Sequence, residues 1–234
     1  MEVILLLGPP GSGKGTLAQQ LTQRNPNLRH VSTGDLLREA VAQNTPAGLQ
    51  AAPIMKRGEL VPDPLIAEML RDYLMGARVS NPRDGECKSG GLQIRPPPTF
   101  LLDGFPRNLA QATLLDALLS DCSIPLRAAI LLDVPERILL SRITGRRVCP
   151  TCKNIHHITT RPPKNENHCD TCGSPLIQRP DDSPSTVLRR LSVYNDATSS
   201  LITLYASRNL LKKVNADAPP PEIAENILRL MAHG

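Results

Sequence analysis

Short apolar runs alternate along this chain with longer segments whose apolar residues recur every three or four positions. The runs at residues 3–7, 100–102 and 129–132 contain no polar side chain, which is typical of strands buried on both faces. The periodic segments predict helices beginning near Leu17 and at residues 65–74, 109–119, 135–144, 185–211 and 221–231. Strands that alternate with helices predict an α/β fold with a doubly wound parallel sheet.

Two stretches interrupt this alternation. Residues 76–99 are rich in glycine and proline and have little apolar content, which predicts a long, mobile loop. We assign it no role and interpret it as a tolerated surface insertion. Residues 145–183 hold four cysteines, three histidines and several prolines and lack helical periodicity. They are interpreted as a small inserted domain.

The composition narrows the ligand class. The chain has 234 residues with 2% aromatic side chains and no tryptophan, so its core must consist of leucine, isoleucine, valine and alanine. Few aromatic side chains argue against a surface that stacks nucleic-acid bases. The net charge of +5, from 27 basic and 22 acidic residues, suits a phosphate-rich ligand but is too small to require a polyanion.

The N-terminal apolar run is predicted to be a strand and not a targeting signal. A Gly/Pro-rich segment follows it at once, and it lacks a basic region and a cleavage site. The sequence contains no run of about 20 apolar residues, the length that spans a bilayer. We expect a cytoplasmic monomer without a leader segment, in a reducing compartment and without membrane or nucleic-acid partners.

The strongest chemical signal is the segment Gly8-Pro-Pro-Gly-Ser-Gly-Lys-Gly-Thr16, directly after the first predicted strand. Glycines allow consecutive backbone N–H groups to surround phosphate oxygens, and the lysine reaches the outer phosphates. A glycine-rich turn alone would mean little, but the strand before it and the helix after it favour phosphate binding. Gly15 stands where most such loops have serine or threonine, and the hydroxyl follows at Thr16, which argues against a motor protein or a GTPase.

Four further segments accompany this loop in order along the chain. They are Ser32-Thr-Gly-Asp-Leu-Leu-Arg38; Leu101-Leu-Asp-Gly-Phe-Pro-Arg107 followed by Gln111; Arg142-x-x-x-Arg146; and Arg179-x-Asp-Asp182 followed by Arg190. Together they resemble the nucleoside monophosphate kinase family, specifically the long-lid adenylate kinases. The resemblance covers nearly the whole chain. It implies a P-loop NTPase-type core at residues 1–31, 62–144 and 184–234, an AMP-binding segment at 32–61 and a zinc-binding lid at 145–183.

The activity implied by this resemblance is reversible phosphoryl transfer from MgATP to AMP, giving two ADP. The implied small-molecule partners are ATP, AMP and ADP, and the implied cofactors are Mg²⁺ and a structural Zn²⁺. Phosphoryl transfer depends on alignment and on neutralising charge, for which bidentate arginines are suited. The implied catalytic residues are Lys14, Asp103, Arg107, Arg146, Arg179 and Arg190.

The resemblance also implies binding residues for each nucleotide. For ATP they are Gly11, Ser12, Gly13, Lys14, Gly15, Thr16, Arg142, Arg146, Ile155, His156 and Ala218. For AMP they are Thr33, Arg38, Glu59, Leu60, Val61, Gly104, Phe105, Pro106, Arg107, Gln111, Arg179 and Arg190. Within these sets Arg38 and Arg107 would hold the AMP phosphate, Gln111 would pair with the adenine edge, and Asp103 would orient the water shell of Mg²⁺.

Two positions depart from the family pattern. Glu59 stands where a lysine is usual, which is harmless if backbone groups of this segment contact AMP. His156 replaces an aromatic residue that often precedes the lid histidine, which leaves open whether this side chain packs over ATP.

Two Cys-x-x-Cys pairs, Cys149/Cys152 and Cys169/Cys172, flank sixteen residues. Each pair can form a tight turn, and two such turns offer Zn²⁺ a tetrahedral set of four thiolates that leaves no open position. A reducing compartment argues against two disulfides, and the paired spacing argues against four unliganded thiols. Cys87 and Cys122 are expected to be ordinary thiols. The histidines at 156, 157 and 168 are expected to be solvent-exposed or hydrogen-bonded.

Three other functions remain as alternatives. A GTP:AMP phosphotransferase would share the fold and the motifs and differ in the donor base. A pyrimidine-nucleotide kinase is disfavoured because those enzymes resemble the short-lid form. A zinc-ribbon nucleic-acid-binding protein would use the cysteines and the positive charge, but the P-loop, the matched arginines and the few aromatic residues argue against it.

Overall fold

The computed structural model describes residues 1–79 and 98–232 and contains a five-stranded parallel sheet. Its strands, in spatial order, are β2 (Leu28–Ser32), β3 (Thr99–Asp103), β1 (Glu2–Leu7), β4 (Leu126–Asp133) and β7 (Leu211–Asn215). The predicted α/β class with a parallel sheet is confirmed. Leu6 pairs with Asp103, and Ser32 pairs with the same residue, so three strands end at one edge of the sheet.

Helices cover both faces of the sheet, which explains the unbroken apolar runs. On one face pack α1 (Lys14–Arg24), α6 (Glu136–Thr144) and α8 (Pro220–Ala232), against Ile4 and Leu6 of β1. On the other face pack α4 (Asp63–Val79), α5 (Leu109–Asp121) and the second half of α7 (Pro184–Ser207), against Val3 and Leu5. Alternate residues of one strand thus belong to two separate cores.

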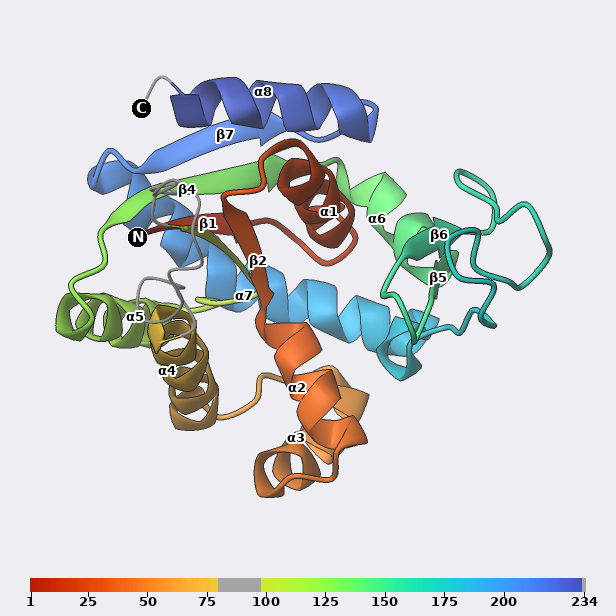
Figure 1. The fold of residues 1–234 in the computed structure, drawn as a ribbon, viewed down its shortest axis with the longest axis horizontal. Helices are drawn as coiled ribbons and strands as arrows, with labels where there is room; N and C mark the ends of the chain where they lie inside the picture. The colour runs from red at the N-terminus through yellow and green to blue at the C-terminus, as the bar shows by residue number, and fades with distance from the viewer. Residues whose placement is uncertain (80–97, 233–234) are drawn as a thin grey trace, which may run out of the picture.

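Two groups of elements lie at the ends of this layered core (Figure 1). One is the pair α2 (Thr33–Ala42) and α3 (Pro46–Arg57), which pack closely where Gly48 meets the main chain of Ala40. The other is a two-stranded antiparallel sheet, β5 (Arg146–Val148) and β6 (Ile155–His157), followed by the 3-10 turn η1 (Pro180–Asp182). These groups fall within the segments that the sequence analysis separated from the core.

The predicted helix over residues 185–211 is wrong at its end. Helix α7 stops at Ser207, Asn209 adopts a left-handed conformation with φ 57°, and the chain enters β7. The apolar residues near position 211 continue the helical pattern of α7, but their partner is β4, since Ala129 pairs with Leu211. The pairing with β4 therefore determines that the residues near position 211 form a strand, which the local periodicity could not indicate.

The predicted loop over residues 76–99 is also shorter than expected, because α4 continues to Val79 and β3 begins at Thr99. The rest of that prediction, and Cys87, lie outside the described residues. Among the residues that are described, no helix is both long enough and apolar enough to cross a membrane.

Candidate active site

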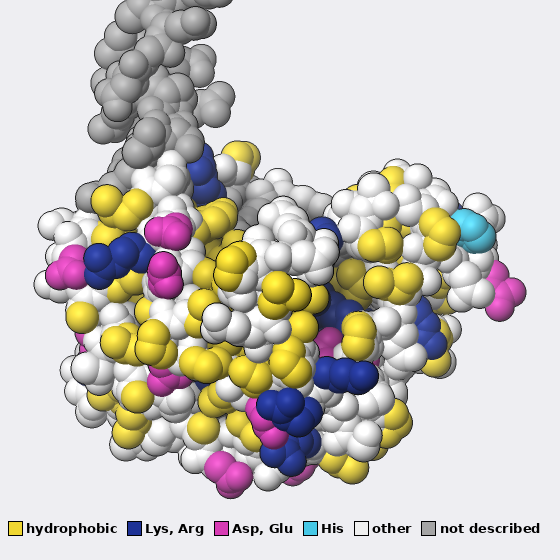
Figure 2. Space-filling model, turned by 90° about the horizontal axis from the view of Figure 1, so that it is seen from below, with side chains coloured by type: hydrophobic (Ala, Val, Ile, Leu, Met, Phe, Trp, Pro, Cys, Tyr) yellow, Lys and Arg dark blue, Asp and Glu magenta, His cyan; other side chains and the backbone are white. Residues whose placement is uncertain are grey.

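A cleft of about 760 Å³ opens at the edge of the sheet where β1, β2 and β3 end. In Figure 2 the surface is hollowed between the main body and the smaller lobe that contains β5 and β6, and Lys and Arg side chains gather along this hollow. Predicted site residues from distant parts of the sequence meet there: Gly11, Ser12, Gly13, Lys14, Gly15, Thr16, Thr33, Arg38, Glu59, Leu60, Val61, Asp103, Gly104, Pro106, Arg107, Arg142, Arg146, Ile155, His156, Arg179, Arg190 and Ala218.

The loop between β1 and α1 forms a cradle that depends on glycine. Gly11 has φ 82°, and a Cβ there would lie 2.8 Å from the side chain of Ile143. Gly13 has φ 94° and is the N-cap residue of α1, whose first residue is Lys14. The unpaired N–H groups at the start of α1 therefore face the cleft with the positive end of the helix dipole, which is a favourable site for an anion.

The unusual glycine after the lysine has a structural reason. A Cβ at Gly15 would lie 3.3 Å from Cδ1 of Ile155, which belongs to β6. A larger side chain at this position would push against that residue. Strand β6 of the smaller lobe thus contacts the phosphate cradle directly. The sequence of the loop alone does not show this contact.

Lys14 is partly buried in this cleft. Its Nζ donates hydrogen bonds to the carbonyl oxygens of Gly8 at 2.8 Å and Pro9 at 3.0 Å. Burial lowers the pKa of Lys14 to about 8, an effect that the Asp103 carboxylate opposes and the charges of Arg107 and Arg190 strengthen. A negatively charged ligand in the cradle would oppose this shift, because a neighbouring negative charge favours the protonated amine.

Asp103 ends β3 beside the cradle, and its carboxylate lies 3.5 Å from Nε2 of His30. Burial alone would raise the pKa of this carboxyl, but His30 and the Lys14 charge outweigh burial and hold it below its ordinary value. The group is therefore a buried carboxylate that stays ionised.

Arginines from several elements converge on the cleft and contact carboxylates there. Arg38 Nη2 lies 2.6 Å from Asp35, and Arg179 Nη2 lies 3.4 Å from the same oxygen. Arg146 forms a two-point contact with Asp182. Arg190 lies 2.9 Å from Asp181 and 3.4 Å from Asp182. These carboxylates thus form ion pairs with guanidinium groups that are able to bind phosphate.

Burial among like charges weakens the hold of two arginines on their protons. Burial lowers the pKa of Arg107 to about 10, and the neighbouring Arg190 adds to the effect. Burial likewise lowers the pKa of Arg179 to about 10, with Arg38 and Arg146 contributing. Both groups still carry a full charge near neutral pH. The cleft therefore concentrates positive charge that an anionic ligand would relieve.

Two predicted AMP residues do not line the cleft among the described residues. Phe105 is buried in the core on the α4, α5 and α7 face of the sheet. Gln111 is fully buried: its Oε1 accepts from the N–H of Arg107 at 2.7 Å, and its Nε2 donates to Asp63 at 2.7 Å. Both residues support the Arg107 loop in this structure, and any contact with a base would require the covering side chains to move.

The remaining predicted residues lie at the edges of the cleft. Arg142 donates to the carbonyl of Ala216 at 3.2 Å, close to the loop that carries Ala218. Glu59, at the position where the family usually has lysine, accepts from Arg57 at 2.9 Å and from Arg189 of α7 at 2.8 Å. The negative charge of Glu59, which stands where the family usually has a positive one, therefore links the segment after α3 to α7.

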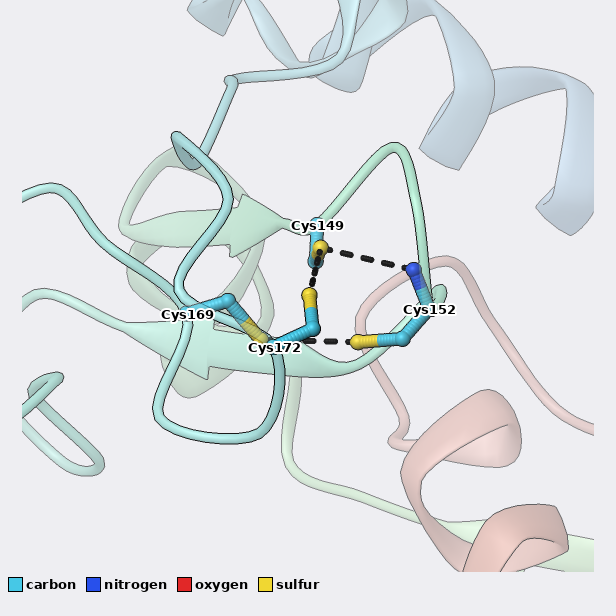
Figure 3. Close-up of side chains that lie close together, drawn as sticks. All are labelled: Cys149, Cys152, Cys169 and Cys172. Atoms are coloured by element: carbon cyan, nitrogen blue, oxygen red, sulfur yellow. Dashed lines mark hydrogen bonds between the residues drawn. The ribbon is translucent and has the colours of Figure 1, made fainter.

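The four predicted metal ligands do come together (Figure 3). Their sulfur atoms lie within 4.8 Å of one another, with Cys149–Cys172 and Cys152–Cys169 separations of 3.4 Å. Four thiolates around Zn²⁺ at 2.3 Å would be separated by about 3.8 Å, so the observed spacing fits a tetrahedral metal. Hydrogen bonding to Ser174 lowers the pKa of Cys172 to about 6. For Cys152, a backbone hydrogen bond that lowers the pKa is outweighed by desolvation and hydrogen bonds to the other three thiols, which raise the pKa above its ordinary value.

The histidine prediction is correct for two residues and wrong for the third. His157 lies 3.1 Å from the Ser141 carbonyl, and His168 lies 2.8 Å from that of Glu166. His156 is 1% exposed, and neither ring nitrogen has a hydrogen-bond partner among the described residues. On β6 its side chain alternates with its neighbours and points into the small lobe, 3.8 Å from Asp170.

The sequence analysis assigned no role to several residues that shape the site. Asp35, Asp181 and Asp182 were visible inside the quoted motifs, so their proximity to arginine could have been proposed from the sequence. His30 lies two residues before Ser32, but only the strand pairing brings it to Asp103. Thr198, which also lines the cleft, has no motif at all.

Comparison with known proteins gives one consistent result. A sequence profile described as Adenylate kinase matches residues 6–84 and 92–210. The chain is 42% identical over 228 residues to an adenylate kinase of Clostridium tetani, an alignment that covers 97% of each chain. It is 40% identical over 228 residues to one of Clostridium perfringens, again with 97% of each chain covered. An adenylate kinase of Thermodesulfovibrio yellowstonii is 41% identical over 228 residues, with 97% of this chain and 98% of the relative covered.

Proposed function

This chain belongs to the adenylate kinase family, whose activity is nucleotide phosphoryl transfer, and from that premise we propose that it transfers a phosphoryl group from MgATP to AMP. The observation that carries the proposal is the meeting of a P-loop, its lysine Lys14 and five motif arginines in one cleft: Arg38, Arg107, Arg146, Arg179 and Arg190. Such a cleft can hold the phosphates of the donor and of the acceptor on either side of the phosphoryl group that is transferred.

Donor binding begins at the P-loop. The phosphates of ATP accept hydrogen bonds from the N–H groups between Gly11 and Thr16, at the N-terminus of α1. Lys14 leaves the carbonyls of Gly8 and Pro9 and turns to the outer phosphates, where its positive charge is stabilised. Arg142, Ile155 and Ala218 border the donor base and ribose, whereas the buried side chain of His156 stays within the small lobe beside the cleft.

Acceptor binding uses the arginines opposite the P-loop. Arg38 and Arg107 hold the AMP phosphate, and Arg146, Arg179 and Arg190 contact the oxygens of the transferred group. Phosphate oxygens replace Asp35, Asp181 and Asp182 as partners of Arg38, Arg146, Arg179 and Arg190, so these four arginines keep a negative partner throughout. The fixed guanidinium groups align the reacting oxygens and stabilise the charge that develops during transfer.

Asp103 suits the role proposed for it beside the magnesium ion that accompanies ATP. Its carboxylate is buried and ionised at the end of β3, close to Lys14. Bound Mg²⁺ would supply positive charge against the charge that develops on the phosphates during transfer. Asp103 would orient water molecules of the hydration shell of the ion.

We further propose that the four cysteines hold a structural Zn²⁺ and that residues 145–183 act as a lid. Arg146, at the start of this segment, and Asp182, near its end, lie in direct contact. The segment is small, so a metal replaces the apolar core that it cannot form. Closing such a lid would exclude water from the phosphates and limit hydrolysis.

Purified protein incubated with ADP and Mg²⁺ is expected to form ATP and AMP in equal amounts without any added acceptor. With AMP as acceptor, ATP is expected to give a higher kcat/KM than GTP. Chromatographic separation of the nucleotides measures both results.

Each alternative has its own outcome in this assay. Hydrolysis of ATP to ADP and phosphate with ADP left untouched would refute the proposed transfer. A preference for GTP as donor would identify a GTP:AMP phosphotransferase. A gel-shift assay at physiological salt tests the nucleic-acid alternative, and tight binding there would contradict the assignment of the cleft.

The lowered pKa of Lys14 predicts that ATP binding takes up protons at alkaline pH. Without nucleotide this amine, with a pKa of about 8, is mostly neutral at pH 8.5. A neighbouring phosphate raises the pKa toward its ordinary value, so binding adds roughly half a proton or more at that pH. Calorimetry in buffers of different ionisation enthalpy measures this uptake. Equal uptake by Lys14→Met would show that another group is responsible.

A further inference from the structure

The main chain of Arg107 is held on both sides. Its N–H donates to Oε1 of Gln111 at 2.7 Å, and its carbonyl accepts from Oγ1 of Thr198 at 2.9 Å. The side chain is anchored as well, since Nε donates to the carbonyl of Gly104 at 2.8 Å. The peptide therefore has little freedom to move.

The hydrogen bond from Thr198 differs from those of three other threonines beyond the first turn of a helix; Thr33, which bonds the distant Asp103 carbonyl, is the first residue of α2. Thr22, Thr113 and Thr144 each donate to the carbonyl four residues earlier in their own helix. Thr198 is buried in α7 and instead bonds a loop residue 91 positions away in the sequence. Satisfying a buried hydroxyl did not require this distant partner, because the local alternative was available.

Helix α7 carries Thr198 on the same face as Arg190. Arg190, Tyr194 and Thr198 follow one another at intervals of four residues, and all three line the cleft. The helix thereby connects two arginines from separate motifs. It carries Arg190 directly, and it holds the Arg107 loop through the threonine hydroxyl.

The two guanidinium groups need such an anchor because they repel each other. The charge of Arg190 lowers the pKa of Arg107, second only to burial, so the two groups interact strongly. Asp181 and Asp182 fix Arg190. Arg107 depends on its hydrogen bonds to Gly104, Gln111 and Thr198 to remain in place.

We propose that Thr198 is a positioning residue: its hydroxyl bond to the Arg107 carbonyl sets the Arg107 guanidinium in register with Arg190 for binding the acceptor phosphate. This inference rests on the proposed function, which gives Arg107 the phosphate of AMP. It adds a residue that no sequence motif marks and defines α7 as the element that spaces the two arginines.

Thr198→Val removes the hydroxyl and keeps the side-chain shape. We expect the dissociation constant for AMP to rise about tenfold, the value of one hydrogen bond, while that for ATP stays within about twofold. Thr198→Ser retains the hydroxyl and should restore AMP binding to within about threefold of the wild type. Thr203→Val, the same substitution at an exposed position of α7, is the matched control and should change neither constant.

A double-mutant cycle separates positioning from a general structural effect. In an Arg107→Lys background, Thr198→Val should weaken AMP binding much less than in the wild type, because the residue acts through Arg107. Equal effects in both backgrounds, or wild-type AMP binding by Thr198→Val, would overturn the inference. If the valine variant does not fold, Thr198→Ala takes its place in the cycle. AMP binding is measured without turnover, so a wild type that binds AMP but transfers nothing would refute the proposed function separately.

Discussion

Lys14→Met is expected to lower kcat by a factor of about 10²–10³, the usual loss when a charged group that stabilises a transition state is removed. Methionine is similar in length to lysine, so the variant isolates the charge. Lys14 lies partly buried at the start of α1 and points to the carbonyls of Gly8 and Pro9, within the loop proposed to hold the outer phosphates. Steady-state kinetics with varied ATP and saturating AMP measures the effect.

The same substitution should change the melting temperature little in the absence of nucleotide. Burial opposes the charge of Lys14, so removing this charge relieves a cost that partly offsets the lost hydrogen bonds. Lys212→Met, at an exposed position of β7, is the control and should have wild-type kinetics. A kcat within about threefold of the wild type in Lys14→Met would contradict the proposed role, because electrostatic stabilisation of this kind predicts a far larger loss.

The second large effect is expected from removing a zinc ligand. We predict about one zinc per chain, since four thiolates complete one tetrahedral site. Cys149→Ser or Cys172→Ser should abolish most of this zinc and lower the temperature at which residues 145–183 unfold. A metal that binds only the folded segment adds its binding free energy to that fold, and structural zinc contributes about 10–16 kcal/mol in isolated zinc-finger peptides.

The loss should be confined to the lid, because both apolar cores lie against the large parallel sheet. Hydrogen exchange would show early opening of residues 145–183 with the sheet still protected. Transfer activity should survive in part at low temperature, with more ATP hydrolysis relative to transfer. Cys122→Ala, a buried thiol outside the cluster, serves as the control and should keep its zinc. Full activity of a metal-free protein with four titratable thiols in this segment would contradict the proposed structural zinc site.

Motifs made of consecutive residues were predictable because their geometry is local. Glycine tolerates the positive φ values that Gly8, Gly11 and Gly13 adopt in the P-loop, and the spacing within each Cys-x-x-Cys pair determines one tight turn. Both predictions appear in the structure as a cradle at Gly11–Gly13 and a cluster of four sulfur atoms. The family resemblance then identified residues far apart in sequence, and most of them line one cleft.

Residues whose surroundings come from elsewhere in the chain were harder to predict. His156 is predicted to be solvent-exposed or hydrogen-bonded, yet the alternation along β6 turns it into the small lobe, where it is buried and has no hydrogen-bond partner among the described residues. Gln111 reads as a base contact, yet in this structure its amide joins the N–H of Arg107 to Asp63. Neither outcome has a periodic signal, since each depends on which distant side chain covers the position.

The sequence by itself determined the α/β class, the phosphate cradle and the two cysteine pairs, because apolar periodicity and short spacings act within a few residues of one another. Only the tertiary structure decided that residues 211–215 form a strand, since their pairing with β4 is parallel and joins segments about 80 residues apart. It also decided that Thr198 bonds to Arg107 and that Asp35 is shared by Arg38 and Arg179. The contacts of Thr198 with Arg107 and of Arg179 with Asp35 join segments far apart in the sequence, a long-range property that no local pattern records.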